Sequence, residues 1–142
     1  MKTDLPDVNV LVALFMQSHE HHDAAHAWLV SAQRFATTPL TESGFVRVMM
    51  AGTPVTDPIT CAEAISSLRE LRELPSAVFL PDSTSWVDRR MVTTHVIGHK
   101  QVPDTHLLNL AIAHGGRLVT FDKRITPSLS KQTQTHVVPL PF

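Results

Sequence analysis

Short runs of strand-forming residues alternate along this chain with longer stretches of helical periodicity. Residues 117–121 read as a strand, for example, whereas residues 103–114 have helical spacing between a proline and two glycines. Such alternation is typical of a parallel sheet whose strands are joined by helices. The sequence therefore predicts an α/β fold.

The predicted elements follow the order βααβααβααβ, with one further strand at the end. We expect strands at residues 5–9, 34–38, 77–80, 117–121 and 136–138, and helices at 10–18, 19–31, 41–51, 60–71, 86–94 and 103–114. Pro39 is expected to stop the second strand, and Thr41 and Thr60 to cap the helices that follow them. With 142 residues and no repeat or linker, the chain is predicted to form a single domain spanning 1–142.

Composition indicates a soluble cytoplasmic protein. The chain is 43% hydrophobic, enough for a core, and its longest apolar run, Val10 to Met16, is far shorter than the roughly 20 residues that span a bilayer. Lys2 is followed closely by acidic residues, unlike a secretory signal. The one cysteine, Cys61, cannot form an internal disulfide, which fits a reducing compartment. The net charge of −1 shows no basic excess, so positive charge for a nucleic acid would have to be local or supplied by metal.

Four acidic residues fall where the predicted strands end or the next helices begin. They are Asp7, Glu42, Asp104 and Asp122. Because ligands of parallel sheets bind beyond the carboxyl ends of the strands, we expect these four side chains at one edge. Taken singly, Glu42 or Asp104 is more often a helix cap. Taken together, four carboxylates would repel one another unless cations bind, and oxygen ligands suit Mg²⁺ or Mn²⁺.

Several segments resemble a known family. Residues 7–11 (DVNVL) look like the opening motif of PIN-domain nucleases, and in particular of VapC-type toxins. The resemblance continues through 41–48 (TESGFVRV), 103–108 (PDTHLL) and 114–122 (HGGRLVTFD), in order and at domain-sized spacing. It covers the chain from Pro6 to about Ile125. The sequence is therefore similar to PIN-domain ribonucleases that serve as toxins of type II toxin–antitoxin systems.

The resemblance implies a three-layer α/β/α sandwich with a central parallel five-stranded sheet. It also implies a metal-dependent endoribonuclease that binds one or two Mg²⁺ or Mn²⁺ ions and cuts RNA, such as tRNA or ribosomal RNA. The matching acidic quartet is Asp7, Glu42, Asp104 and Asp122, supported by Asn9 and Thr120. Implied partners are an antitoxin protein and a second copy of the chain, and the insert near 54–75 corresponds to a clip-like region for dimer contacts and substrate access.

The sequence departs from some relatives after Asp122. Where they carry a further acid, this chain has Lys123 and Arg124, which become candidates for contacts with RNA phosphates, as does Arg47 on the rim of the site. The departure leaves open whether one or two ions bind.

Three other functions are weighed against this one. A phosphatase using Asp7 as nucleophile normally carries a second aspartate two residues later, where this chain has Asn9. A receiver-like signalling domain normally has adjacent acids after the first strand, and only Asp82 suits its pattern. A catalytically inactive PIN module that binds RNA or protein is the remaining alternative.

A histidine cluster at 19–26 is the most conspicuous local feature outside the acidic set. His22 and His26 have the i, i+4 spacing of zinc ligands, but no cysteine or carboxylate pattern completes a zinc site. The favoured interpretation is a polar helix start packed by Trp28. Similarly, Cys61 has no nearby histidine that would activate a thiol, and Arg89 and Arg90 fit a solvated helix face.

Overall fold

The computed structural model describes residues 2–141, which form a five-stranded parallel sheet between two helical layers. The strands are β1 (Asp4–Pro6), β2 (Phe35–Thr37), β3 (Ala77–Phe79), β4 (Arg117–Thr120) and β5 (Val137–Pro139), arranged in the order β3-β2-β1-β4-β5. The helices are α1 (Val8–Phe15), α2 (His22–Ser31), α3 (Pro39–Ala51), α4 (Cys61–Arg72), α5 (Val102–Ala113) and the short α6 (Lys131–Gln134). The short 3₁₀ turns η1 (His99–Gln101) and η2 (Thr126–Ser128) complete the fold.

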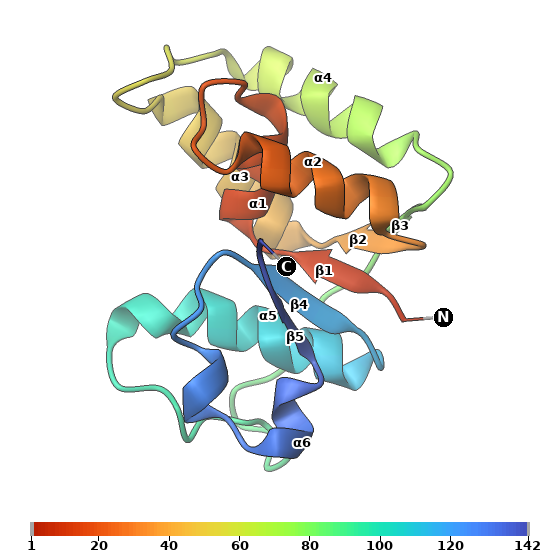
Figure 1. Ribbon diagram of the computed structural model, residues 1–142, viewed down its shortest axis with the longest axis vertical. Coiled ribbons are helices and arrows are strands. Elements are labelled where there is room, and N and C mark those ends of the chain that lie inside the picture. The colour runs from red at the N-terminus through yellow and green to blue at the C-terminus, as the bar shows by residue number, and fades with distance from the viewer. Residues whose placement is uncertain (1, 142) are drawn as a thin grey trace.

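Two apolar cores lie on the two faces of this sheet. Helices α1 to α4 cover one face and α5 covers the other (Figure 1). Alternate strand residues serve the two cores: Phe35 and Val119 belong to the first, and Ala36 and Leu118 to the second. This alternation follows from the opposite directions of successive side chains in a strand. The predicted three-layer α/β/α arrangement is confirmed.

The sheet order excludes one alternative and sets the polarity of the site. In a receiver-like fold the strand order is 2-1-3-4-5, whereas here β1 lies between β2 and β4. All strand pairs are parallel, so the carboxyl ends of β1, β2 and β4 face the same edge. Within residues 2–141, no helix is both long and apolar enough to cross a bilayer.

The helix predicted at 86–94 is wrong, because this segment consists of turns and irregular structure. Side chains here bond to backbone amides two residues ahead: Asp82 Oδ1 accepts from the Thr84 amide at 3.0 Å, and Asp88 Oδ1 from the Arg90 amide at 2.9 Å. Such local bonds compete with helical ones. The Asn109 side chain then holds the segment in place, through the amide and the carbonyl of Val92.

Element boundaries near the sheet also differ from prediction. Strand β1 ends at Pro6 rather than at Asn9, which lies in the first turn of α1. Helix α3 starts at Pro39 rather than after Thr41, since proline suits the first helical position. Thr38 is the residue before this helix, and its amide donates to Thr41 Oγ1 at 3.1 Å. Helix α6 lies in a stretch where no helix was predicted.

Candidate active site

Asp7 connects β1 to α1 at the centre of the sheet. Its amide donates to the Val119 carbonyl of β4 at 3.0 Å, and its Oδ1 accepts from the Val10 amide at 3.0 Å, capping α1. The residue is only 3% exposed. Burial raises the pKa of the Asp7 carboxyl, against the lowering effect of hydrogen bonds from the Thr120 side chain and the backbone, and the charge of Asp122 adds to the rise.

Asp104 lies in the first turn of α5. Burial, followed by the negative charges of Asp7 and Asp122, raises the pKa of its carboxyl to about 7. A carboxylate at the start of a helix is ordinarily stabilised in its charged form by the helix dipole. The opposite shift here follows first from burial and second from the nearby charges of Asp7 and Asp122.

Asp122 follows β4 and is held differently. Its amide donates to Thr120 Oγ1 at 3.1 Å, while its Oδ1 accepts from the Arg124 amide at 2.9 Å and from Arg124 Nε at 3.1 Å. These bonds from Arg124 lower the pKa of Asp122. Since the Arg124 side chain is 92% exposed, this ion pair is a weak surface pair that a competing cation can displace.

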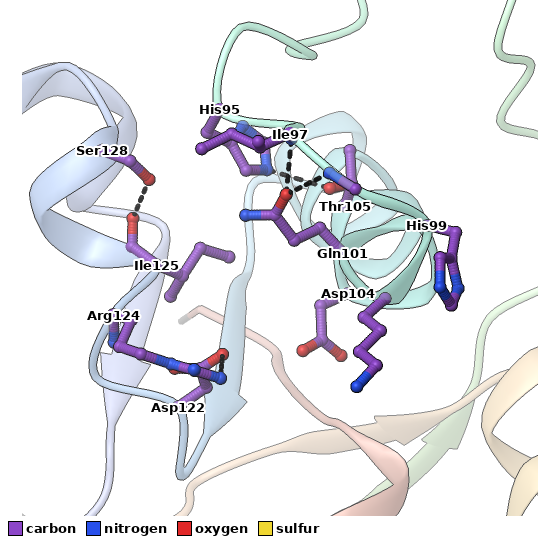
Figure 2. Close-up of a pocket in the computed structure, with 12 residues that line it drawn as sticks. His95, Ile97, His99, Gln101, Asp104, Thr105, Asp122, Arg124, Ile125 and Ser128 are labelled. Carbon is purple, nitrogen blue, oxygen red and sulfur yellow. Dashed lines mark hydrogen bonds and ion pairs between the residues drawn. The ribbon is translucent and has the colours of Figure 1, made fainter.

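The three aspartates border two adjoining cavities. The first, of about 660 Å³, is lined by Asp7, Asn9, His19, Glu20, His21, Asp104, Thr120, Phe121, Asp122, Lys123 and Arg124. The second, of about 550 Å³, shares Asp104, Asp122 and Arg124 and extends toward His95 and η1. Figure 2 shows the Asp104 carboxylate pointing into this second cavity from α5, with Asp122 beside Arg124 on the segment after β4. We call the first cavity the aspartate pocket.

Glu42 and Arg47 do not line the aspartate pocket. Both line a separate groove between α3 and α4. Oε2 of Glu42 accepts a hydrogen bond of 2.6 Å from Thr37 Oγ1 and lies 3.6 Å from Arg72 Nη1. The structure therefore gathers the other predicted site residues and leaves these two on a neighbouring surface. A role for Glu42 and Arg47 in the site stays a prediction.

His19, His21 and Phe121 line the aspartate pocket although the sequence did not single them out as site residues. The favoured interpretation placed the histidine cluster against Trp28, but the Trp28 indole donates to Asp4 and its ring packs on Phe35. His21 instead stacks on Phe121. The one signal in the sequence was the position of Phe121, directly before Asp122.

The donor set of the aspartate pocket suits a hard divalent cation. Asp7, Asp104 and Asp122 offer carboxylate oxygens, which Mg²⁺ and Mn²⁺ prefer. The negative charges of Asp7 and Asp122, which together with burial raise the pKa of Asp104, would be neutralised by a cation. As the side chains stand, no three acidic, histidine or cysteine groups within residues 2–141 converge on one ion position, and Asp122 is turned to Arg124. Binding of one ion by all three would require these side chains to converge.

The parallel sheet, with aspartates after β1 and β4 and at the start of α5, defines a class of nuclease-like domain. The sequence model of the PIN domain family matches residues 5–127. The chain therefore belongs to the PIN domain family.

Close relatives of the chain carry VapC names. It is 40% identical to ribonuclease VapC39 of Mycobacterium tuberculosis over 135 residues, which cover 90% of this chain and 94% of that protein. Ribonuclease VapC38 of the same organism is 40% identical, with 94% of each chain covered. Ribonuclease VapC44 is 36% identical, with 90% and 94% covered. These similarities confirm the VapC-type resemblance of the sequence.

Proposed function

We propose that this protein is a metal-dependent endoribonuclease and the toxin of a toxin–antitoxin pair. It hydrolyses phosphodiester bonds of RNA, in tRNA or ribosomal RNA, and thereby inhibits translation. The observation that carries the proposal is the meeting of Asp7, Asp104 and Asp122, from three distant segments, around one pocket. The charges of Asp7 and Asp122 contribute, after burial, to the raised pKa of Asp104, which supports this proximity. Relatives named ribonucleases, similar over nearly the whole chain, support the same reaction.

Five side chains of the aspartate pocket have a role in this proposal. Asp7, Asp104 and Asp122 hold one or two Mg²⁺ or Mn²⁺ ions, and Thr120 orients Asp7 through its hydroxyl. A bound divalent ion supplies activated water and neutralises charge on the phosphate. Asn9 lies on the exposed first turn of α1 at the pocket wall, where its amide can orient the substrate or a water molecule.

Basic residues on the rim supply the local positive charge that the net charge does not. Lys123 and Arg124 are both exposed and line the aspartate pocket. Arg124 pairs with Asp122 and can exchange this partner for a substrate phosphate when Asp122 turns to a cation. Lys123 is a further phosphate contact in this proposal.

Two protein partners belong to the same proposal. An antitoxin would cover the acidic pocket, and a second copy of the chain would pack on the helical insert near 54–75. In the structure this insert contains α4, which packs against α3. Exposed apolar side chains at Met50 and Ile65 line the groove between the two helices and are suited to such contacts. Light scattering of the purified chain, alone and with its antitoxin, tests both assemblies.

The cleavage test uses purified protein, free of partner, with total cellular RNA. Discrete fragments are expected with Mg²⁺ or Mn²⁺ and none with EDTA. Asp7→Asn should abolish cleavage while the fold stays intact, because asparagine also caps a helix. The matched control is Asp23→Asn, which removes an exposed carboxylate outside the pocket and outside the 54–75 insert, and should cleave as the parent does.

Either result is decisive. Fragments that require both metal and Asp7 support the nuclease, and mapping of their ends names the target bond. Intact RNA from a protein with native circular dichroism, under every metal condition, would overturn the enzyme and leave a PIN module that only binds RNA or protein.

A further inference from the structure

Three aromatic rings form one wall of the aspartate pocket. The His21 ring stacks on Phe121 with centroids 4.4 Å apart and an interplanar angle of 25°, and His19 stacks at 6.1 Å and 27°. All three residues are half-buried, so none is closed off from solvent. His19 and His21 come from the turn between α1 and α2, and Phe121 from the end of β4. We call this wall the ring platform.

The turn that carries the two histidines is fixed by its own hydrogen bonds. The His19 amide donates to the Met16 carbonyl at 3.0 Å, and the His22 amide donates to the His19 carbonyl at 3.0 Å. His19 Nδ1 accepts from the His21 amide at 3.0 Å, which ties the first ring to the backbone of the second. A ring held in this way loses little conformational freedom when a ligand stacks on it. The ring platform is therefore preorganised.

The groups around the ring platform and the size of the pocket suit the binding of one nucleotide. The same pocket contains the aspartates and the basic residues Lys123 and Arg124, so a flat apolar surface and a phosphate-binding edge lie together. Its volume of about 660 Å³ is within the roughly 300–1,000 Å³ of ordinary small-ligand sites. Unstacked bases of single strands bind proteins by stacking on aromatic and histidine rings, whereas the faces of bases inside a duplex are covered by their neighbours in the stack.

We propose that His19, His21 and Phe121 form a stacking platform for one unpaired nucleobase, next to the phosphate that lies at Asp7, Asp104 and Asp122. The inference rests on the proposed function for the identity of that phosphate as the scissile one. Base stacking itself depends only on the ring platform. It selects single-stranded RNA, or a base that has left its pair, and not a particular base sequence.

Binding of a fluorescent probe tests the proposal without cleavage. The probe is a ten-nucleotide single-stranded RNA with 2-aminopurine placed at each position in turn, added with Mg²⁺ to the Asp7→Asn protein. Stacking of 2-aminopurine on the ring platform is expected to quench its fluorescence at one position. His21→Ala in the same background should abolish this quenching and weaken binding by about tenfold.

Two further variants separate stacking from a structural role. His21→Phe keeps a flat ring and should restore both quenching and affinity, although it removes the imidazole. His26→Ala is the matched control, because His26 is exposed on α2 and does not line the pocket. It should leave quenching unchanged. His21→Ala does not remove a helix cap, since the His21 side chain makes no capping bond to α2.

An RNA probe that lacks one base completes the test, because base and His21 can then be removed separately and together in a double-mutant cycle. Removal of the base at the quenched position should weaken binding to the parent background about tenfold, and should cost nothing further in His21→Ala. Additive losses, or quenching that survives His21→Ala, would overturn the ring platform. Failure of the cleavage test with intact, His21-dependent quenching would instead overturn only the proposed hydrolysis.

Discussion

Nη1 of Arg72 lies 3.6 Å from Oε2 of Glu42, so a carboxylate of the predicted acidic quartet is paired with an arginine of α4. The same oxygen accepts the Thr37 hydroxyl at 2.6 Å. The Arg72 guanidinium also lies over the Phe79 ring, 4.7 Å from its centroid. Glu42 is thus part of a contact between α3, α4 and the carboxyl ends of β2 and β3, and it lies outside the pocket that Asp7 and Asp104 line.

Glu42→Gln is therefore expected to reduce cleavage less than Asp7→Asn. Glutamine keeps the Thr37 hydrogen bond and loses only charge, so we expect a reduction of about tenfold, against about 1,000-fold or more for Asp7→Asn. Initial rates on one RNA substrate measure both. Glu73→Gln, in the same groove, is the control and should cleave normally. Equal losses for Glu42→Gln and Asp7→Asn would show that Glu42 joins the pocket during the reaction.

Asp104→Asn should stabilise the metal-free protein at high pH. The folded pKa of Asp104 is about 7 and the ordinary value is 3.8, so the folded state binds the proton more tightly. Stability conferred by this proton is present below pH 4 and is lost as pH rises through 7. At pH 8 in EDTA, we expect the variant to gain about 2 kcal/mol in free energy of unfolding, after allowance for solvent screening, and little at pH 4. Urea unfolding at both pH values checks this; equal effects would contradict it.

Metal binding at pH 7 should release protons. Because the pKa of Asp104 is about 7, roughly half of its carboxyl groups are protonated before an ion arrives, and binding requires the charged form. We expect about half a proton released for each Mg²⁺ bound, and none at pH 9. Calorimetry in buffers of different ionisation enthalpy measures it. Asp23→Asn should release as many protons as the parent, whereas binding without any buffer dependence at pH 7 is incompatible with the assignment.

Asp4 is expected to matter for stability and not for the site. Its Oδ2 accepts the Trp28 indole at 2.9 Å, and its Oδ1 lies 2.8 Å from Arg117 Nη2. The residue is 3% exposed, so Asp4→Ala would leave the buried Trp28 indole without its acceptor and remove the ion pair with the half-exposed Arg117, at a cost of about 3 kcal/mol. Asp88→Ala breaks a solvent-exposed pair with Arg90 and should cost much less stability than Asp4→Ala. Chemical denaturation compares them; similar losses would refute this contrast.

Gly116 permits a close backbone approach at the start of β4. A Cβ built there would lie 2.3 Å from the Thr3 carbonyl oxygen, to which the Arg117 amide donates at 2.9 Å. Gly116→Ala must therefore separate the strands and should lower the free energy of unfolding by about 2 kcal/mol. Gly98→Ala is the control, since a Cβ there meets nothing within 4 Å. The midpoint of thermal unfolding should fall for Gly116→Ala and stay unchanged for Gly98→Ala. An unchanged midpoint for Gly116→Ala would contradict the strand packing described.

Where local signals were strong, sequence reasoning placed the elements well. Helix α5 runs between the predicted proline and glycines, and the strand before Asp122 lies where its apolar run indicated. No helix forms at 86–94 because Asp88 and its neighbours accept hydrogen bonds from nearby backbone amides. Helical propensity alone does not predict such bonds. The start of α3 was misplaced because Pro39 begins a helix as readily as it ends a strand.

The sequence by itself determined the layered sheet and the arrival of Asp7, Asp104 and Asp122 at one edge, because strand periodicity and parallel polarity are properties of local pattern. Only the tertiary structure decided the rest. The pKa of Asp104, the pairing of Glu42 with Arg72 and the stack of His21 on Phe121 all depend on distances between segments far apart in the chain. Electrostatic and stacking energies change steeply with such distances, which no local pattern encodes.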